Sequence, residues 1–271
     1  MKRILISIIT LISIAVSAQI KPQGIITQPR VMVWDTVITD DPNFPGQKLF
    51  SIVDQDGYYR QVGHLLNGKL EGTWRYYGEN TLLTSLEEYH LGKKNGVKLM
   101  FANTGFVTNE ENYKNDLRDG FTRTFGMNGI RKSEEMFRGG VLNGIKRTYY
   151  DNGRVSEEGW WKNGKRDSLA RWFFQDGGTA VEYHYKNGML EGEAKAWFEN
   201  GKLQSVGNYK SNQEEGNWKE FYQGEILKAE GNYKAGKKSG AWREYDDNGV
   251  LIKTILYDDN GNVLKETPAK P

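Results

Sequence analysis

The sequence predicts an all-β protein: a single-layer, elongated antiparallel β-meander of about eight β-hairpin repeats, each 24 residues long. Three observations predict it. Asn-Gly or Asp-Gly pairs recur at a fixed offset, and aromatic residues recur at two others. Glycines recur at spacings of 24 residues or a multiple, at Gly72, Gly96, Gly120, Gly144, Gly192, Gly216 and Gly240. A register kept over this length is an internal repeat, and repeat proteins grow by stacking units rather than by enlarging one core.

Aromatic residues form two columns relative to these glycines, which we call the grid glycines. Seven residues before each grid position stand Leu65, Tyr89, Tyr113, Phe137, Trp161, Tyr185, Tyr209 and Tyr233. Five residues after it stand Tyr77, Phe101, Phe125, Tyr149, Phe173, Trp197, Phe221 and Tyr245. The two offsets differ in parity, so the columns should point to opposite faces of a sheet. Rings on both faces suit a sheet that no helix or second sheet covers. Each repeat should lengthen such a sheet by about 10 Å, which is two strand spacings.

Asn-Gly pairs between strand-like runs predict the hairpin turns, because Asn and Gly tolerate positive φ. If Asn152-Gly153 is a two-residue turn, Asp151 faces Arg154, Tyr149 faces Ser156 and Arg147 faces Glu158. The same rule places opposite charges across three further hairpins, at Arg123 and Glu134, Arg171 and Glu182, and Lys219 and Glu230. Such cross-strand pairs help to fix the register. Two hairpins do not follow the rule, with Arg75 opposite Leu86 and Lys195 opposite Val206.

Composition and charge narrow the function classes. The chain has 271 residues, no cysteine, and a net charge of +2 with basic and acidic residues interleaved. The charge pattern lacks the basic footprint of a nucleic-acid binder, so we expect no nucleic-acid partner. The absence of cysteine excludes disulfides, thiolate chemistry and zinc sites that need cysteine.

The N-terminus has the pattern of a secretory signal peptide. Lys2 and Arg3 precede an apolar run over Ile4–Val16, and small residues then lead to a cleavage position after Ala18. A transmembrane anchor is the alternative, but the run is shorter than the ~20 residues that a span needs. The sequence therefore predicts a signal peptide at residues 1–18 and export to a periplasm, the cell envelope or beyond.

The segments that flank the repeats differ from them in composition. Residues 19–47 hold four of the six prolines and one strand-like run, Val31–Thr39. We interpret this stretch as a linker and a capping strand over the open edge of the sheet, with a binding arm as the alternative. The repeat array is predicted at residues 48–264, with half-repeats at Leu49–Tyr59 and Ile255–Leu264, and a tail at 265–271.

The repeat resembles the MORN repeat, as in the segments Tyr185–Gly192 and Trp197–Leu203. The period of 24 and the Asn-Gly-x-Leu endings are similar to its bacterial variant, which occurs in antitoxin proteins of the YwqK type. The resemblance covers residues 48–264. It implies a scaffold, a lipid-associating surface or a dimerising plate, or else an antitoxin that neutralises a toxin or effector. Departures from the pattern, at Ser168, Asp116, Asn212 and Tyr222–Glu225, suggest local bulges and one turn shifted by a residue.

No residue constellation predicts a catalytic, cofactor or metal site. His64 and His184 lie five repeats apart, about 50 Å, so they cannot share a metal. Glu87, Glu111 and Glu135 recur about 10 Å apart, too far to share an ion, and indicate a charged face. The Asp-rich turns at 246–248 and 258–260 could recruit Ca²⁺, but turn chemistry explains them without an ion, and we favour that interpretation.

The aromatic rings carry the functional prediction. The candidate binding-face aromatics are Tyr89, Tyr113, Phe137, Trp161, Tyr185, Tyr209 and Tyr233. The tryptophans, among them Trp74, Trp160, Trp218 and Trp242, either bind a ligand or pack on neighbouring rings and on Arg and Lys stems. We expect a non-enzymatic exported scaffold that binds a protein in the cell envelope through its sheet face. The alternatives are a module that binds envelope polysaccharide or lipid, and an antitoxin-like protein. The oligomeric state stays open.

Overall fold

The chain forms one open antiparallel β-sheet. The computed structural model describes residues 34–269, and the predicted signal peptide lies outside them. Within this range there is no helix. The strands are β1 (Asp35–Asp40), β2 (Gln47–Val53), β3 (Tyr59–Leu66), β4 (Lys69–Tyr77), β5 (Leu83–His90), β6 (Lys93–Phe101), β7 (Val107–Lys114), β8 (Leu117–Phe125), β9 (Arg131–Arg138), β10 (Val141–Tyr149), β11 (Val155–Lys162), β12 (Lys165–Phe173), β13 (Thr179–Lys186), β14 (Met189–Trp197), β15 (Leu203–Lys210), β16 (Gln213–Glu214), β17 (Gly216–Phe221), β18 (Leu227–Lys234), β19 (Lys237–Tyr245), β20 (Leu251–Tyr257) and β21 (Val263–Pro268).

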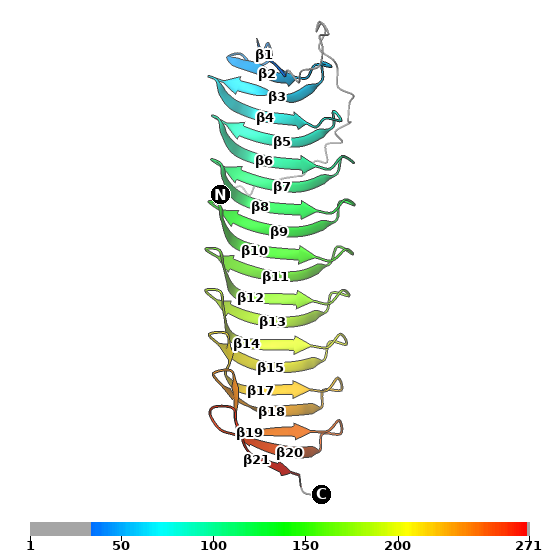
Figure 1. The fold of residues 1–271 in the computed structure, drawn as a ribbon, viewed down its shortest axis with the longest axis vertical. Helices are drawn as coiled ribbons and strands as arrows, with labels where there is room; N and C mark the ends of the chain where they lie inside the picture. Colours follow the sequence, from blue (N-terminus) through cyan, green and yellow to red (C-terminus); the bar gives the residue numbers. More distant parts are fainter. Residues whose placement is uncertain (1–33, 270–271) are drawn as a thin grey trace, which may run out of the picture.

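With the exception of β16, each strand pairs with the strand that follows it in the chain, so the sheet is a meander (Figure 1). β15 pairs with both β16 and β17, because the strand is interrupted at Glu215. The strands lie one below another from β1 to β21, and no second layer of described residues covers either face. The predicted fold class is confirmed. Part of the strand-like run Val31–Thr39 forms β1, which pairs with β2 along Asp35–Asp40, while residues 31–33 lie outside the description.

Two kinds of turn alternate along the sheet and define its two rims. One is a two-residue turn such as Asn67-Gly68, in which both residues have positive φ, at 51° and 72°. The other is a three-residue loop, in which the N–H of Gly153 donates to Tyr150 O and the N–H of Tyr150 donates to Arg154 O. Only Gly153 has positive φ there. We call the edges formed by these turns the two-residue rim and the three-residue rim.

The predicted turn at Asn152-Gly153 is therefore wrong in detail, although the charge pairs it predicted are correct. Tyr149 faces Val155 rather than Ser156, and Arg154 faces Tyr150 rather than Asp151. A bulge between Thr148 and Tyr149 then moves the register by one residue. This shift compensates for the longer loop and returns Arg147 to its place opposite Glu158. The pairs predicted at Arg123, Arg171 and Lys219 are confirmed in the same way.

The grid glycines lie in β-bulges. In β4, for example, the bulge that contains Gly72 lies opposite the register shift between Val62 and His64 of β3. All have positive φ, and at Gly144 an added Cβ would lie 2.8 Å from Met136 Cβ. Ser168 keeps this conformation with a φ of 72°, and Asp116 and Asn212 keep theirs at 68°. The predicted shift of the turn at Tyr222–Glu225 is wrong. Glu225 takes the positive φ that glycine has in other copies, and its N–H donates to Tyr222 O.

Both rims carry contacts that tie each repeat to the next. At the two-residue rim, a carboxylate accepts a backbone N–H from the turn 20 residues later, as Glu71 accepts from Leu91 at 2.8 Å. Four more acids repeat the bond: Asp119 with Gly139, Asp167 with Asn187, Glu191 with Ser211, and Glu215 with Ala235. At the three-residue rim, the hydroxyls of Tyr150 and Tyr222 donate to carbonyls in the following repeat, those of Phe173 and Tyr245.

Candidate functional site: two faces of one sheet

The two aromatic columns lie on opposite faces, as parity predicted. The hydroxyl of Tyr89 donates to Glu87 on one face, and the hydroxyl of Tyr149 donates to Glu134 on the other. We call the first, with the Tyr89 column, the ring face. We call the second, with the Arg and Glu residues of the predicted cross-strand pairs, the ladder face.

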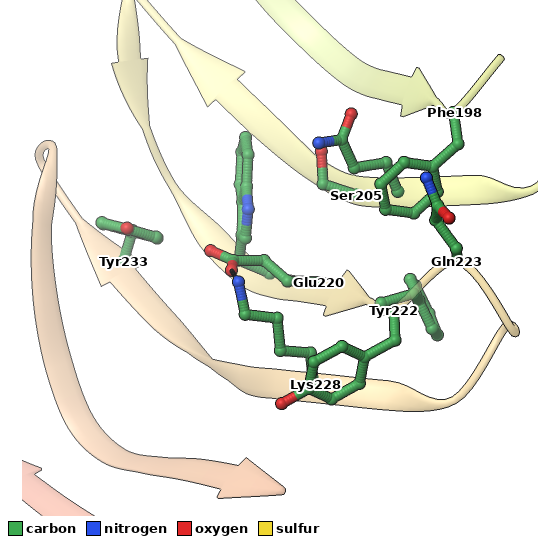
Figure 2. Close-up of a pocket in the computed structure, with 10 residues that line it drawn as sticks. Phe198, Ser205, Glu220, Tyr222, Gln223, Lys228 and Tyr233 are labelled. Atoms are coloured by element: carbon green, nitrogen blue, oxygen red, sulfur yellow. Dashed lines mark ion pairs between the residues drawn. The ribbon is translucent and has the colours of Figure 1, made fainter. Parts of the chain in front are cut away.

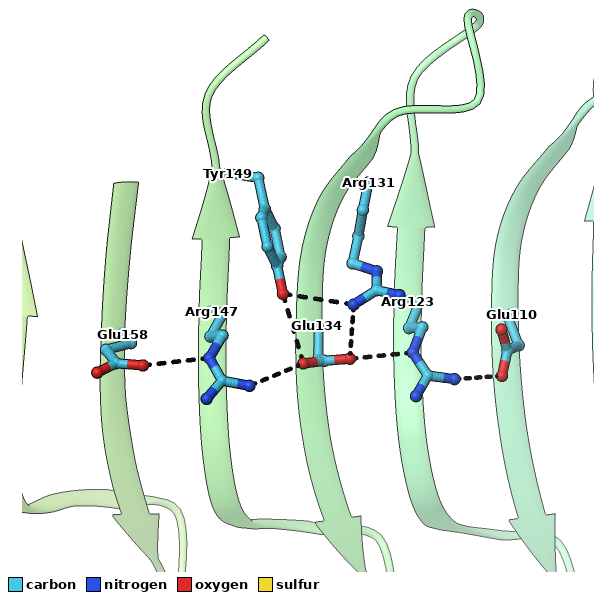
Figure 3. Close-up of polar contacts among 7 residues, drawn as sticks. All are labelled: Glu110, Arg123, Arg131, Glu134, Arg147, Tyr149 and Glu158. Atoms are coloured by element: carbon cyan, nitrogen blue, oxygen red, sulfur yellow. Dashed lines mark hydrogen bonds and ion pairs between the residues drawn. The ribbon is translucent and has the colours of Figure 1, made fainter. Parts of the chain in front are cut away.

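The ladder face carries a continuous row of alternating charges across seven strands, β7 to β13. In order, the row is Glu110, Arg123, Glu134, Arg147, Glu158, Arg171 and Glu182. Its nitrogen-to-oxygen distances run from 2.6 Å, between Arg123 and Glu110, to 3.5 Å, between Arg171 and Glu158. Figure 3 shows the central part of this row. Each interior arginine lies between two glutamates on neighbouring strands, so the row fixes both side chains and register.

Glu134 is the most buried carboxylate of the row, with 4% of the residue exposed. It accepts hydrogen bonds from Arg123, Arg131 and Arg147, and from the hydroxyl of Tyr149 (Figure 3). Burial acts to raise the pKa of Glu134, but the bonds and positive charges of the three arginines outweigh it and hold that pKa below its usual value. The carboxylate therefore stays ionised and acts as the centre of the row.

An apolar strip runs beside the charged row on the ladder face. The paired residues are Phe121 with Met136 and Ile145 with Trp160, followed by Leu169 in the next strand. Four of the five are half-buried, and Trp160 is the exception, with 52% of its surface exposed. In the repeat before, Met136 packs in the space left by the missing side chain of Gly144. Ser168 holds the matching position opposite Trp160 and brings a Cβ into that space, which fits the outward position of the indole.

On the ring face, the seven predicted binding-face aromatics are largely covered. Phe137 is 9% exposed and the other six are half-buried. Cations from the preceding strand lie over two of these rings, with Lys94 Nζ 5.4 Å from the Tyr113 centroid and Arg118 Cζ 5.3 Å from that of Phe137. Tyr113 also donates to Glu111. The rings thus serve as the core of a one-layer sheet, and a ligand role for this column stays a prediction.

From β12 to β19 the ring face has a chain of rings in edge contact. Successive centroids lie 5.1–5.8 Å apart through Trp172, Tyr183, Tyr209, Trp218, Tyr233 and Trp242. Trp242 is fully buried and Trp74, at the same repeat position, is 2% exposed. Each of these two lies on a glycine of the preceding strand, Gly231 and Gly63, where a Cβ would come within 2.5 Å of the ring.

Each of the three histidines has a local partner in the described chain. His64 pairs with Asp41 at 2.7 Å, His90 pairs with Glu71, and His184 contacts the backbone oxygen of Glu193. Among residues 34–269 no group of three or more His, Asp or Glu side chains could hold a metal ion. In the same range no helix is long and apolar enough to cross a membrane.

The two acidic features weighed as ion sites have local partners. Glu87 pairs with Lys94 and Lys98, Glu111 with Arg118, and Glu135 with Lys146. In the Asp-rich turns, Asp246 accepts the N–H groups of residues 248 and 250, and Asp258 accepts those of 260 and 262. These bonds are ordinary Asx-turn chemistry.

A third aromatic column was missed by the sequence reasoning. It stands six residues after the grid position, at Tyr150, Phe174, Phe198 and Tyr222, and occupies only four consecutive copies. Two of its members line an open pocket of about 580 Å³ between β14, β15, β17 and β18, together with Trp218 and Tyr233 (Figure 2). The signal was present in the sequence, but the column is short and its first two copies hold Gly78 and Ala102.

Comparison with known families gives one match. Residues 190–211, 214–235 and 238–259 each match the family described as MORN repeat variant. These are three consecutive repeats at the C-terminal end of the array, and the other copies share their strand and turn pattern. No curated protein matches the chain. A MORN-type repeat in an open one-layer sheet fits a repeat scaffold for protein or lipid interaction, and this repeat is generally a non-catalytic module.

Proposed function

We propose that the chain is an exported, non-enzymatic scaffold that binds a partner protein across the ladder face. One observation carries the proposal: Trp160 is 52% exposed at the centre of an otherwise half-buried apolar strip. An outward indole beside fixed arginines has the composition of an interface anchor, because Trp and Arg are the residue types that contribute most to protein interfaces.

The charged row supports this role through preorganisation. Arg147 and Arg171 flank the strand of Trp160, and each is held by two glutamates. A partner therefore meets side chains that are already ordered, which lowers the entropy cost of binding. The row is close to neutral overall, so it favours a partner with an apolar ridge and mixed polar groups over a highly charged surface.

Export rests on the N-terminal pattern of a charged start and an apolar run. It places the partner in the cell envelope or outside the cell. An antitoxin-like role is a narrower version of the same proposal, in which the partner is an exported toxin or effector. Binding of envelope polysaccharide or lipid is the alternative from another class.

The test compares two tryptophans of equal exposure. Trp160 and Trp34 are both 52% exposed, but Trp34 lies at the N-terminal end of the described chain. The mature chain (residues 19–271), Trp160→Ala and Trp34→Ala would each be used to capture proteins from the host envelope fraction, with captured proteins and glycans identified.

We expect one stoichiometric protein that is kept by Trp34→Ala and lost by Trp160→Ala, while both variants keep the parent melting temperature. A partner retained by both variants would move the interface away from the ladder face. Retention of glycan or lipid without protein would overturn protein binding.

A further inference from the structure

The pocket on the ring face differs from the rest of that face through one residue, Trp218. Trp74, Trp218 and Trp242 share a repeat position two residues after the grid, and each lies on a glycine of the preceding strand. Two of the three are buried, whereas Trp218 is only half-buried. The comparison of these three equivalent residues shows how Trp218 differs from the other two.

The indole of Trp218 is displaced relative to its equivalents. At Gly63 and Gly231 the atoms nearest an added Cβ are Cδ2, Cε2 and Cγ of the indole, but at Gly207 they are Cε3, Cδ2 and Cζ3 of Trp218. The benzene half of Trp218 thus lies over the glycine. The indole N–H of Trp74 donates to His64 O at 3.2 Å and that of Trp242 to Asn232 O at 2.9 Å. Within residues 34–269 the indole N–H of Trp218 has no such acceptor.

In the described part of the chain, no cation lies over the outer side of the Trp218 ring. Lys238 lies over Trp242, with Nζ 4.1 Å from the ring centroid. The residue at the matching place before Trp218 is Glu214, whose carboxylate interacts with the hydroxyl of Tyr209 at 3.5 Å. A carboxylate has no attraction for the negative face of a ring, whereas an ammonium does. Trp218 therefore forms a floor between Tyr209 and Tyr233, whose planes stand at 88° and 77° to it.

Polar groups without partners surround this floor. The side chains of Gln204, Ser205 and Gln223 line the pocket and make no hydrogen bond within the described chain. Glu220 faces Lys228 at 4.0 Å, a long contact in which both side chains stay more than a third exposed (Figure 2). The pocket thus offers an indole donor, a carboxylate acceptor, and amide and hydroxyl groups that are both.

We propose that this pocket binds a neutral hexopyranose unit of a glycan, with Trp218 as the stacking surface. A pyranose has apolar C–H faces that suit an indole floor and a belt of hydroxyls that donate and accept, as the rim of the pocket requires. An apolar peptide side chain would leave the donor and the acceptor unpaired, which costs free energy. Glu220 and Lys228 offset each other, so the site favours a ligand without charge. The pocket volume of about 580 Å³ lies within the usual range for small-ligand sites.

The site is separate from the proposed protein interface, because Trp218 and Trp160 lie on opposite faces of the sheet. A scaffold that holds a glycan on one face and a protein on the other would link the two. Failure of the glycan site would leave the proposed partner of Trp160 untouched, and the two ideas can fail independently.

The test follows the eight indole N–H signals of the ¹⁵N-labelled mature chain by NMR, with Trp218→Phe used to assign the signal of Trp218. The probes are maltohexaose, cellohexaose and chitohexaose at millimolar concentration. We expect at least one of them to shift the Trp218 signal saturably and to leave that of Trp242 in place. Calorimetry should show that Trp218→Ala weakens sugar binding by roughly tenfold or more, which corresponds to at least about 1.4 kcal/mol. Trp160→Ala should leave sugar binding unchanged.

A second variant guards against misfolding of Trp218→Ala. Glu214→Lys should place an ammonium over Trp218, as Lys238 does over Trp242, and so close the site while the fold is kept. Loss of sugar binding in this variant with an unchanged melting temperature supports the proposal. It would be overturned if none of the three hexasaccharides moves the Trp218 signal, or if Glu214→Lys and Trp218→Ala bind as well as the parent chain.

Discussion

Two regions of the repeat array solve the same packing problem with different chemistry. In β5–β10 the buried side chains are mostly polar, with Glu87, Glu111, Thr122 and Glu134 each at or below 8% exposure. In β13–β19 they are Ala194, Ala229 and Trp242, and the ring face above them is filled by aromatic rings in edge contact. Both regions share one backbone pattern.

This difference teaches that the turns and bulges, rather than the central side chains, specify the repeat. A one-layer sheet has no apolar interior that forbids charge, so a row of ion pairs and a row of rings can each cover it. The two rows should lose stability in response to different changes. A buried carboxylate loses stability when it is left alone or protonated, whereas a ring on a glycine loses stability when the space beneath it is filled.

The largest effect should come from the polar region. Replacing Glu134 by Ala leaves Arg123, Arg131 and Arg147 without their shared acceptor, and we expect a loss of about 3 kcal/mol in unfolding free energy. Urea denaturation followed by circular dichroism would measure it. Glu182→Ala is the matched control at the end of the row, where Arg171 keeps Glu158, and it should cost less than about 1 kcal/mol. Equal losses in the two variants would contradict the special position of Glu134.

A smaller loss is expected from the aromatic region. In Gly231→Ala the new methyl group would lie 2.4 Å from Cδ2 of Trp242, a buried ring with no room to move. We expect a loss of about 2 kcal/mol from overpacking, measured in the same urea titration. Gly224→Ala is the control, because its nearest neighbour is Ile226 Cδ1 at 3.9 Å and its φ is not positive. A Gly231→Ala variant as stable as the parent would show that the ring is not fixed by the glycine.

Acid should separate the two regions without any substitution. The pKa values of Glu87 and Glu134 are held below their usual value of 4.5, because bonds to tyrosine, lysine or arginine outweigh the effect of burial. Their contribution to stability is present above the pKa of the unfolded chain and is lost as the pH falls through the lower folded value. Hydrogen exchange followed by mass spectrometry should show β5–β10 losing protection between about pH 5 and pH 3 before β13–β19 does. Simultaneous loss in both regions would contradict this order.

The smallest effect concerns the boundary between the regions. Ser168 has a φ of 72°, a conformation that is costly for serine and easy for glycine. Ser168→Gly should relieve this strain at the expense of a more flexible unfolded chain, and we expect a net gain of about 0.5 kcal/mol. Thermal denaturation would detect it. A loss of stability would mean that the serine side chain has a supporting contact that outweighs its backbone strain.

The architecture could be predicted from the sequence because it follows from local rules. Grid glycines such as Gly144 mark positive φ, and ring parity sets the faces. The turn at Asn152-Gly153 could not be predicted in the same way, because Asn-Gly suits both a two-residue turn and the last two positions of a three-residue loop. The bulge at Thr148 hides the difference, since it restores the pairing of Arg147 with Glu158.

The candidate sites were less predictable than the fold. The sequence contains Trp74, Trp218 and Trp242 as equivalent residues, and nothing in their spacing says that one of them is uncovered. The difference depends on the residue four positions before each tryptophan, which is Glu214 for Trp218 and Lys238 for Trp242. It also depends on a small displacement of the Trp218 indole. Likewise, the exposure of Trp160 depends on Ser168, which lies opposite it in the next strand. This pairing becomes visible only when neighbouring repeats are stacked.

The bonds at the two rims give the array a direction of assembly. In five of the two-residue turns, the acid that caps the turn lies 20 residues before it, as Glu71 does for Leu91 and Glu191 for Ser211. During synthesis from the N-terminus, each of these five turns would emerge after its acceptor has been made. Loss of repeats from the C-terminal end would leave the caps of the remaining turns in place, whereas loss from the N-terminal end would remove the acid that caps a later turn. The array is thus built to be extended, and to be eroded, at its C-terminal end.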